Sequence, residues 1–250
     1  MLDSIFDFFS QERTLRSTQR HQLKEDQFAH TVTEQLQWAA EHRKPLVYGA
    51  VIAAVLVVVL LAGWYYMQSE EQQAALALSG ALRTYNASLR PADSPPSPEQ
   101  ESYPSAAERA KAAIPKLRQV ADKYPSVASG RLARYFLGLS LMEAGDNSGA
   151  EAQLQRVAGS GDKNLASLAR MALAALYRQT GRDPQAIQIY KELVEKPTDT
   201  VAKPAAQLEL ASLYATKDSG EARKLYEQVR LDNPNSAAAS IATSKLAELK

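Results

Sequence analysis

Residues 173–190, LAALYRQTGRDPQAIQIY, carry two apolar helical patterns separated by a turn. In each half a pair of apolar residues lies four apart, about one helical turn. These pairs are Leu173 with Tyr177 and Ala186 with Tyr190. Between them, Gly181 is expected to adopt the left-handed conformation that ends a helix, and Pro184 suits the first turn of the next. The stretch therefore predicts a helical hairpin.

The same pattern recurs at a spacing of 36 residues on both sides of this stretch. A small residue is followed four positions later by a large apolar one in Ala150 with Leu154, Ala186 with Tyr190, and Ala222 with Tyr226. An apolar helical pattern precedes each pair, in Leu137 with Leu141, Leu173 with Tyr177, and Leu210 with Leu213 and Tyr214. A fixed period of this size indicates stacked helical hairpins, in which small residues let paired helices approach closely. The turns 143–147, 179–184 and 216–220 each contain a glycine, which we expect to cap the preceding helix.

An earlier half-unit fits the same register. Its residues Ala113, Leu117, Val120 and Pro125 match Ala222, Tyr226, Val229 and Pro234. Residues 70–250 thus resemble the tetratricopeptide repeat family, whose motif of Leu-Gly, Tyr, Ala, a large aromatic and Pro is followed in part by Leu137, Gly138, Leu141, Ala150 and Leu154. The tryptophan of that motif is replaced by Arg134, Arg170 and Gln207.

This resemblance implies an α-solenoid that binds proteins on its inner wall, formed by the first helix of each hairpin. Mapped onto this sequence, the candidate groove residues are Leu132, Tyr135, Leu139, Met142, Leu168, Met171, Arg178 and Leu208, with Ala175 and Ser212 beside them. Such an apolar wall suits a partner helix or an unfolded apolar stretch of a client. The alternative is that many of these side chains pack against the next hairpin.

Residues 46–67, LVYGAVIAAVLVVVLLAGWYYM, form an uninterrupted apolar run. As a helix, the run extends about 33 Å, enough to cross a hydrocarbon core of about 30 Å. Trp64, Tyr65 and Tyr66 occupy the position of an interfacial aromatic belt. The run therefore predicts a single membrane span at residues 45–68 rather than a buried core helix or a cleaved signal peptide.

Charges flanking the span indicate its orientation. Arg43 and Lys44 precede it, whereas Glu70 and Glu71 follow it, which favours a cytoplasmic N-terminus. In a bacterium the repeat domain would then lie in the periplasm, anchored to the inner membrane. Small residues spaced four apart could also let another membrane helix approach closely. These candidate contacts are Gly49, Ala50, Ala53 and Ala54.

This layout is similar to the bacterial inner-membrane family of ancillary SecYEG translocon subunits with a tetratricopeptide-like periplasmic domain. The resemblance rests on the architecture and on the junction YGAVIAAVLVVVLLAGWYYMQSEEQQAA, beginning at Tyr48. It implies protein partners: translocon components, periplasmic chaperones or emerging client polypeptides.

Two further segments are less informative. Residues 90–104 contain five prolines, which predicts a solvated polyproline loop within the first hairpin, or alternatively an interaction loop. This loop would join a helix near 69–88 to one beginning near Ser105. The cytoplasmic segment 1–44 is expected to contain an apolar-faced start, MLDSIFDFF, and a polar helix that either pairs with another helix or is solvated.

Composition argues against enzymatic and nucleic-acid functions. The chain has no cysteine, and its three histidines, His21, His30 and His42, all precede the span, so the repeat domain lacks the residues of Ser/His, Cys/His or histidine–metal sites. Carboxylates at 143, 146, 192 and 195 are better explained by capping and solvation. A net charge of +1 gives no basic surface for nucleic acid. We predict no catalytic residues, cofactor, metal or small-molecule substrate.

The sequence therefore predicts an all-α protein: a cytoplasmic segment 1–44, a transmembrane helix 45–68 and a repeat domain 69–250. Its expected function is that of a membrane-anchored interaction scaffold, an accessory of the Sec export machinery. The alternative is a structural organiser of a cell-envelope or division complex without client binding.

Overall fold

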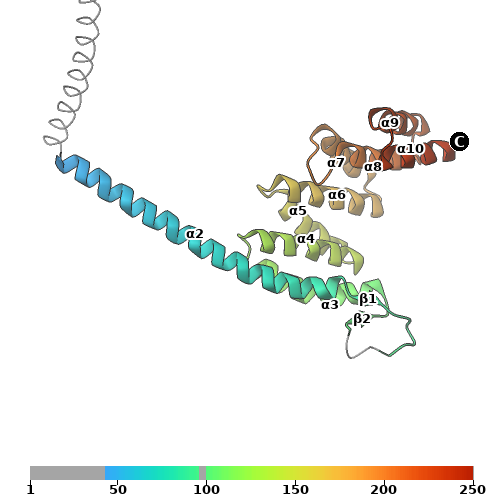
Figure 1. Ribbon diagram of the computed structural model, residues 1–250. Coiled ribbons are helices and arrows are strands. Elements are labelled where there is room, and N and C mark those ends of the chain that lie inside the picture. The colour runs from blue at the N-terminus through green and yellow to red at the C-terminus, as the bar shows by residue number, and fades with distance from the viewer. Residues whose placement is uncertain (1–42, 96–99, 250) are drawn as a thin grey trace, which may run out of the picture. The chain divides into compact units, whose positions relative to one another are not determined.

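A computed structural model describes residues 43–95 and 100–249 (Figure 1). A long N-terminal helix is followed by stacked helical hairpins, so the predicted all-α fold class is confirmed. The chain divides into two compact units, Met1–Tyr65 and Tyr66–Lys250. Residues 1–42 of the predicted cytoplasmic segment 1–44, which include the three histidines, lie outside the described residues.

Helix α2, Arg43–Tyr85, contains the predicted span. Among the described residues it is the helix long and apolar enough to cross a membrane, and its most apolar 18-residue window has a mean hydropathy of 2.8 with no part buried. This is compatible with a single-pass anchor. The predicted helix-contact residues on α2 are all exposed, and no atom lies within 4 Å of the position that a Cβ on Gly49 would occupy.

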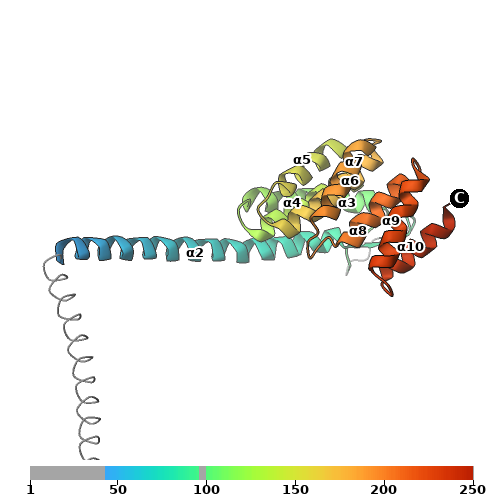
Figure 2. The same cartoon turned by 90° about the horizontal axis from the view of Figure 1, so that it is seen from above.

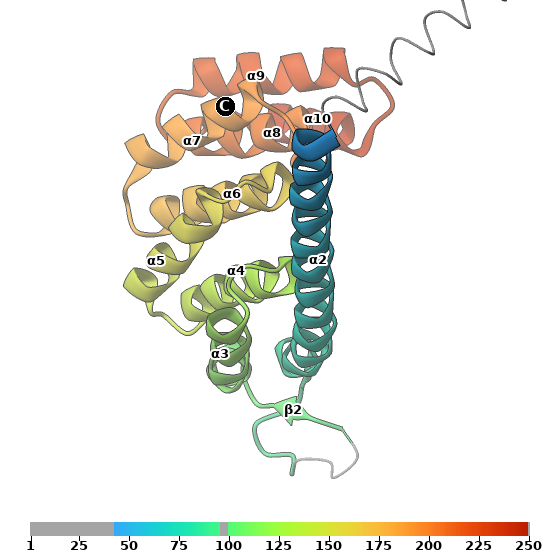
Figure 3. The same ribbon diagram turned by 90° about the vertical axis from the view of Figure 1, so that its left-hand side faces the viewer.

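In the second unit, helices adjacent in sequence pack against each other, and α10 lies against α9 at the end of the array (Figures 2 and 3). The helices are α3 (Ala106–Lys123), α4 (Ala128–Glu143), α5 (Asn147–Ala158), α6 (Lys163–Gln179), α7 (Asp183–Glu195), α8 (Lys203–Tyr214), α9 (Ser219–Asp232) and α10 (Ala237–Glu248).

The repeated small and large residues form the core of this stack. The three alanines at the period of 36 have no exposed surface, and the large residue four positions later is at most 2% exposed in each repeat. These are Ala150, Ala186 and Ala222, followed by Leu154, Tyr190 and Tyr226. Gly138 on α4 shows how close the helices come, because a Cβ there would lie 2.7 Å from Cγ of Leu154 on α5.

Two of the three predicted glycine caps are observed. Gly145 and Gly181 have φ of 86° and 74°, in the left-handed region that glycine adopts at helix ends. The prediction for Gly220 is wrong. That residue lies in the first turn of α9, where its N–H donates to the carboxylate of Asp218 at 3.1 Å, so it belongs to the beginning of a helix.

The ends of the proline-rich loop form contacts that a fully solvated insertion would lack. Helix α2 ends at Tyr85, earlier than expected, and two short strands then pair in parallel: β1 (Ser88–Leu89) and β2 (Ser102–Tyr103). The Glu101 carboxylate accepts hydrogen bonds from Thr84 on α2 at 2.9 Å and from Tyr103 at 2.6 Å. It also pairs with Lys116 on α3 at 3.3 Å. These contacts fasten the C-terminal end of the loop to the first hairpin.

A carboxylate on α2 caps the N-terminus of α4. The N-cap residue, Val127, has no side-chain acceptor. Instead, the Glu71 carboxylate accepts hydrogen bonds from the N–H of Ser129, at 3.2 Å, and from its hydroxyl, at 2.5 Å. A carboxylate at this position satisfies a free helix N–H and interacts favourably with the helix dipole. Glu71 therefore ties the final part of α2 to α4.

We expect Glu71→Ala to lower the free energy of unfolding of the repeat unit by about 1–2 kcal/mol, the usual loss for a helix cap. Glu71→Gln should lower the free energy of unfolding by less, because the amide oxygen remains a hydrogen-bond acceptor. Circular dichroism of the full chain in detergent micelles during denaturant titration would measure both. The matched control is Glu70→Ala, which removes an exposed carboxylate that accepts from Tyr66. Equal losses for Glu70→Ala and Glu71→Ala would contradict the capping role.

Candidate protein-binding groove

The first helices of successive hairpins, α4, α6 and α8, are stacked beside one another (Figure 3). Helix α4 contacts α6, and α6 reaches α8 through a hydrogen bond from Arg178 to the Ser212 hydroxyl at 3.2 Å. All eight predicted groove residues lie on these three helices. The family resemblance assigns the inner wall to this set of helices.

Seven of the eight side chains are apolar and half-buried, and each also touches a buried core cluster. Five meet on the cluster that joins the second, third and fourth hairpins: Leu132, Tyr135, Leu139, Leu168 and Met171. Met142 packs instead on the cluster of the first hairpin, and Leu208 on the C-terminal cluster. These residues therefore contribute to inter-hairpin packing, as the alternative interpretation expected, while each keeps part of its surface exposed.

Arg178, the one charged residue of the predicted set, is engaged within the protein. Its guanidinium lies 3.5 Å from the Glu209 carboxylate on α8, in addition to the hydrogen bond to Ser212. Helix α10 carries a similar internal pair, Lys245 with Glu248 at 2.7 Å. Arg178 is thus paired within the protein.

An aromatic cluster near the first hairpin was not predicted from the sequence. Phe136 on α4 packs edge-to-face with Tyr85 of α2, at a centroid distance of 5.0 Å, and with Tyr135, at 5.4 Å. Burial raises the pKa of both tyrosines, so their hydroxyls stay neutral. The adjacent aromatics at 135 and 136 were the available signal, but the contact with Tyr85 depends on the fold.

Glu143, at the end of α4, is also paired. It lies 3.1 Å from the guanidinium of Arg109 on α3, which donates to the Ala87 carbonyl oxygen as well. Asp146, the other member of this carboxylate pair, caps α5 by accepting from the Gly149 N–H at 2.9 Å. Capping accounts for Asp146, as expected, whereas Glu143 is held in an ion pair where capping or solvation was expected.

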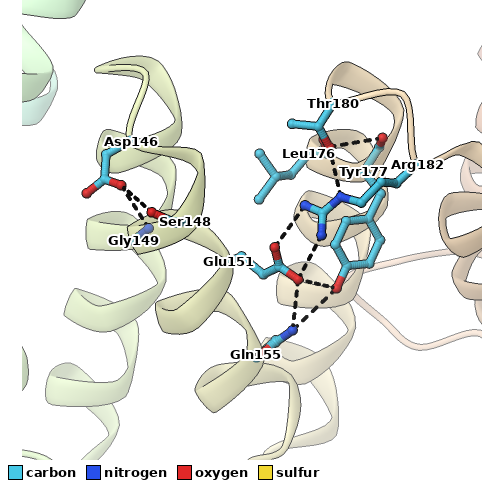
Figure 4. A network of polar contacts seen from close by, with 9 residues as sticks. All are labelled: Asp146, Ser148, Gly149, Glu151, Gln155, Leu176, Tyr177, Thr180 and Arg182. Carbon is cyan, nitrogen blue, oxygen red and sulfur yellow. Dashed lines mark hydrogen bonds and ion pairs between the residues drawn. The ribbon is translucent and has the colours of Figure 1, made fainter.

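A polar network links the second hairpin to the third (Figure 4). The Glu151 carboxylate on α5 pairs with Arg182, at the start of α7, at 2.8 Å, and accepts from the Tyr177 hydroxyl at 3.0 Å. Gln155 donates to the same carboxylate at 3.1 Å. The Arg182 guanidinium also stacks over the Tyr177 ring, 4.3 Å from its centroid. These directional contacts fix the angle between neighbouring hairpins.

Electrostatics in this network favour the ionised pair. The hydrogen bond from Arg182 lowers the pKa of Glu151, and the same interaction raises the pKa of Arg182. Neither residue therefore resembles a general acid or base poised near neutral pH. The geometry is that of a structural link between hairpins.

Across residues 43–95 and 100–249, no group of three or more histidine, cysteine, aspartate or glutamate side chains is arranged to hold a metal ion. The arrangement of the second unit is that of a packed helical array with a half-exposed apolar wall. Such a wall can bind another polypeptide by burying apolar surface.

Two solved repeat proteins resemble the chain at low identity. A tetratricopeptide repeat protein from Parabacteroides merdae is 19% identical with a TM-score of 0.46, over 57% of this chain and 54% of that one. The putative kinesin light chain repeats of Podosopora anserina are 16% identical with a TM-score of 0.49, over 74% of this chain and 85% of that one. The match thus spans about half of the Parabacteroides protein. No curated protein matches this chain.

The family match is more extensive. The model of the family described as "Tetratricopeptide repeat-like domain" matches residues 37–250, which include the whole second unit and the apolar part of α2. Since this is most of the chain, the protein belongs to the tetratricopeptide repeat-like domain family.

Proposed function

We propose that this protein is a membrane-anchored interaction scaffold whose inner wall binds an apolar helix or an unfolded apolar stretch of a client beside the protein-export machinery. Repeats of this family suggest protein interaction in general. The export assignment comes from the resemblance to ancillary SecYEG subunits, and the comparisons name no export component.

The observation that carries the proposal is the chemistry of the wall. Its half-exposed side chains are leucine, methionine and tyrosine, and its one predicted cation, Arg178, is paired with Glu209. A peptide carboxylate would find no unpaired arginine among these eight residues. An apolar segment could instead bury the exposed parts of Leu139, Met171 and Leu208, and methionine adapts to partners of different shape.

Crosslinking tests this assignment. A photoreactive residue at Leu139 in the full chain, in intact membranes, should capture translocon components or emerging clients. Met142→Glu and Met171→Glu should strongly reduce this capture, because each places a charge against an apolar partner. Met171→Leu should retain it, and Gln185→Glu, on the exposed surface of α7, is the charge-matched control.

The outcomes separate the two functions. Capture of envelope-assembly or division proteins alone, with complex assembly unaffected by Met171→Glu, would exclude the export role and favour a structural organiser. Circular dichroism of each variant distinguishes a lost contact from a lost fold.

Orientation is part of the proposal. We propose a cytoplasmic N-terminus and a periplasmic repeat domain, since Arg43 and Lys44 precede the apolar run. Protease should then digest the repeat domain in spheroplasts, or in right-side-out vesicles, and spare it in inverted vesicles. The opposite pattern would place the repeats in the cytoplasm and exclude every periplasmic partner.

A further inference from the structure

We propose, on the basis of the function proposed above, that the inner wall binds its client as an extended chain. The hydroxyls of Tyr85 and Tyr135 donate hydrogen bonds to backbone carbonyl oxygens of that chain. Of the two client forms named above, an apolar helix and an unfolded apolar stretch, the wall therefore takes the unfolded stretch.

The two tyrosines lie on one aromatic surface, where the first hairpin meets the wall. Tyr85 is the last residue of α2, and Tyr135 lies on α4. Both rings pack edge-to-face on Phe136, at centroid distances of 5.0 and 5.4 Å. All three residues belong to the second compact unit, so these contacts lie within that unit. The two phenols thus share one aromatic neighbour and stand close together.

The hydroxyls of both tyrosines are free to bind a ligand. Neither has a hydrogen-bond partner within residues 43–95 and 100–249, and neither is among the polar atoms there that are fully buried without a partner. Both side chains are half-buried. Burial raises the pKa of each phenol, with Glu143 adding to the effect at Tyr85 and Tyr85 adding to it at Tyr135. Both hydroxyls therefore keep their protons at neutral pH and can donate them.

A client that covers this surface must satisfy the two hydroxyls. Solvent water can bond to them while the wall is empty, and burying a hydroxyl without a new partner is costly. Along an α-helix, backbone carbonyl oxygens accept from N–H groups of the same helix, and only the last turn has free acceptors. The side of an apolar helix would leave both phenols unpaired, whereas an extended chain carries free carbonyl oxygens along its length.

Apolar side chains continue the surface beside the phenols. Leu139 and Met142 follow Tyr135 at spacings of four and seven residues, so the three share one face of α4. Met171 on α6 packs on the same core cluster as Tyr135 and Leu139. An extended chain that accepts hydrogen bonds from the phenols can place its apolar side chains on these residues. The wall thus offers donors for a backbone next to an apolar floor for side chains.

Charge contributes little to recognition at this end of the wall. Glu143, the carboxylate nearest to Tyr85 in sequence order on α4, is paired with Arg109 at 3.1 Å. A client would therefore be held by its backbone and by apolar contacts, and both are available to many sequences. This mode of binding would let the wall accept different unfolded apolar stretches.

The test uses two short fluorescent peptides and the full chain in phosphatidylcholine nanodiscs. Both peptides contain the same leucine, phenylalanine and lysine residues. One carries proline at the spacer positions and stays extended, whereas the other carries aminoisobutyric acid there and is helical. Fluorescence anisotropy measures each dissociation constant, and empty nanodiscs give the background of binding to lipid.

The proline peptide should bind at least about fivefold more tightly than the helical peptide. Tyr85→Phe and Tyr135→Phe keep the rings and remove the hydroxyls. Each should weaken binding of the proline peptide by about three- to tenfold, the usual effect of losing one hydrogen bond, and leave binding of the helical peptide unchanged.

Tyr214→Phe is the matched control. Tyr214 is also half-buried, and its hydroxyl has no hydrogen bond in the described part of the chain. It lies two residues beyond Ser212 on α8, so it points to a different side of that helix from the wall. This variant should bind both peptides as the parent does.

Equal or tighter binding of the helical peptide would overturn the extended-chain proposal alone, as would proline-peptide binding that neither Tyr85→Phe nor Tyr135→Phe weakens. In these two cases Met171→Glu still reduces binding, so the apolar wall stands. Binding of neither peptide, or binding that Met142→Glu and Met171→Glu leave unchanged, would overturn the proposed function and the extended-chain proposal together. Circular dichroism of each variant shows whether the repeat unit is folded.

Discussion

Gly130→Ala should destabilise the repeat unit by about 3 kcal/mol or more, since no small adjustment accommodates the added methyl group. Gly130 lies in the first turn of α4, where a Cβ would stand 1.6 Å from the Tyr124 carbonyl oxygen and 2.6 Å from its carbon. Both atoms belong to the backbone and cannot rotate away. Helix α4 would have to move off the end of α3, which would also disturb the cap between Glu71 and Ser129.

Two other glycines provide graded controls, measured by denaturant titration of the full chain in micelles with circular dichroism. Gly138→Ala should lower the free energy of unfolding less than Gly130→Ala does. The added methyl group clashes with the Leu154 side chain, which can adopt another rotamer. Gly80→Ala should raise the free energy of unfolding by about 0.5–1 kcal/mol, because no atom lies within 4 Å of the new methyl group and alanine favours the helix. A Gly130→Ala protein as stable as the parent would disprove the close approach.

The hairpins could be predicted from sequence because their signal is local and repeated. A small residue at one position and a large one four later define a buried helix face, and Ala186 with Tyr190 show this most clearly. Gly130 and Glu71 carry no such signal. Their roles arise from contacts between α2, α3 and α4, which depend on how the hairpins pack.

The positions of the motif tryptophans also show that contacts between helices cannot be predicted from the sequence. Arg134 and Arg170 replace them, and each guanidinium donates to a carbonyl oxygen near the end of the preceding helix, Ala121 at 2.6 Å and Ala158 at 3.2 Å. The sequence shows a lost aromatic residue, whereas the structure shows a polar link between helices. Gln207, at the third such position, is 1% exposed and its side-chain oxygen has no partner in the described part of the chain.

For the candidate groove, the family resemblance predicted a set of residues on the first helices but not the partners of those residues. Arg178 was expected among the groove residues, and only the packing of α6 beside α8 brings it to Glu209. Likewise, spacing could not show that Leu132, Leu139 and Met171 pack on one core cluster. Inter-helix geometry therefore determines how much of the wall remains available for a partner.

Tyr190→Ala should lower the free energy of unfolding by about 3–5 kcal/mol, the usual loss for removing a large aromatic side chain from a core. Tyr190 is 1% exposed and packs in the cluster that joins the second, third and fourth hairpins. Tyr190→Phe keeps the ring, so it should retain most of this stability at neutral pH. The two variants together separate packing from the chemistry of the hydroxyl.

Ionisation of the Tyr190 hydroxyl should lower the stability of the folded state at high pH. Burial, together with the nearby Glu209 carboxylate, raises the pKa of Tyr190 from 10 to about 12. The folded state thus favours the neutral phenol, and its contribution to stability is complete below pH 10 and lost as pH rises from 10 to 12. The loss for this residue is about 3 kcal/mol, since each pKa unit corresponds to about 1.4 kcal/mol. Denaturant titrations across this range should show a shallower decline for Tyr190→Phe than for the parent, and parallel declines would mean that Tyr190 ionises as readily in the folded chain as in the unfolded one.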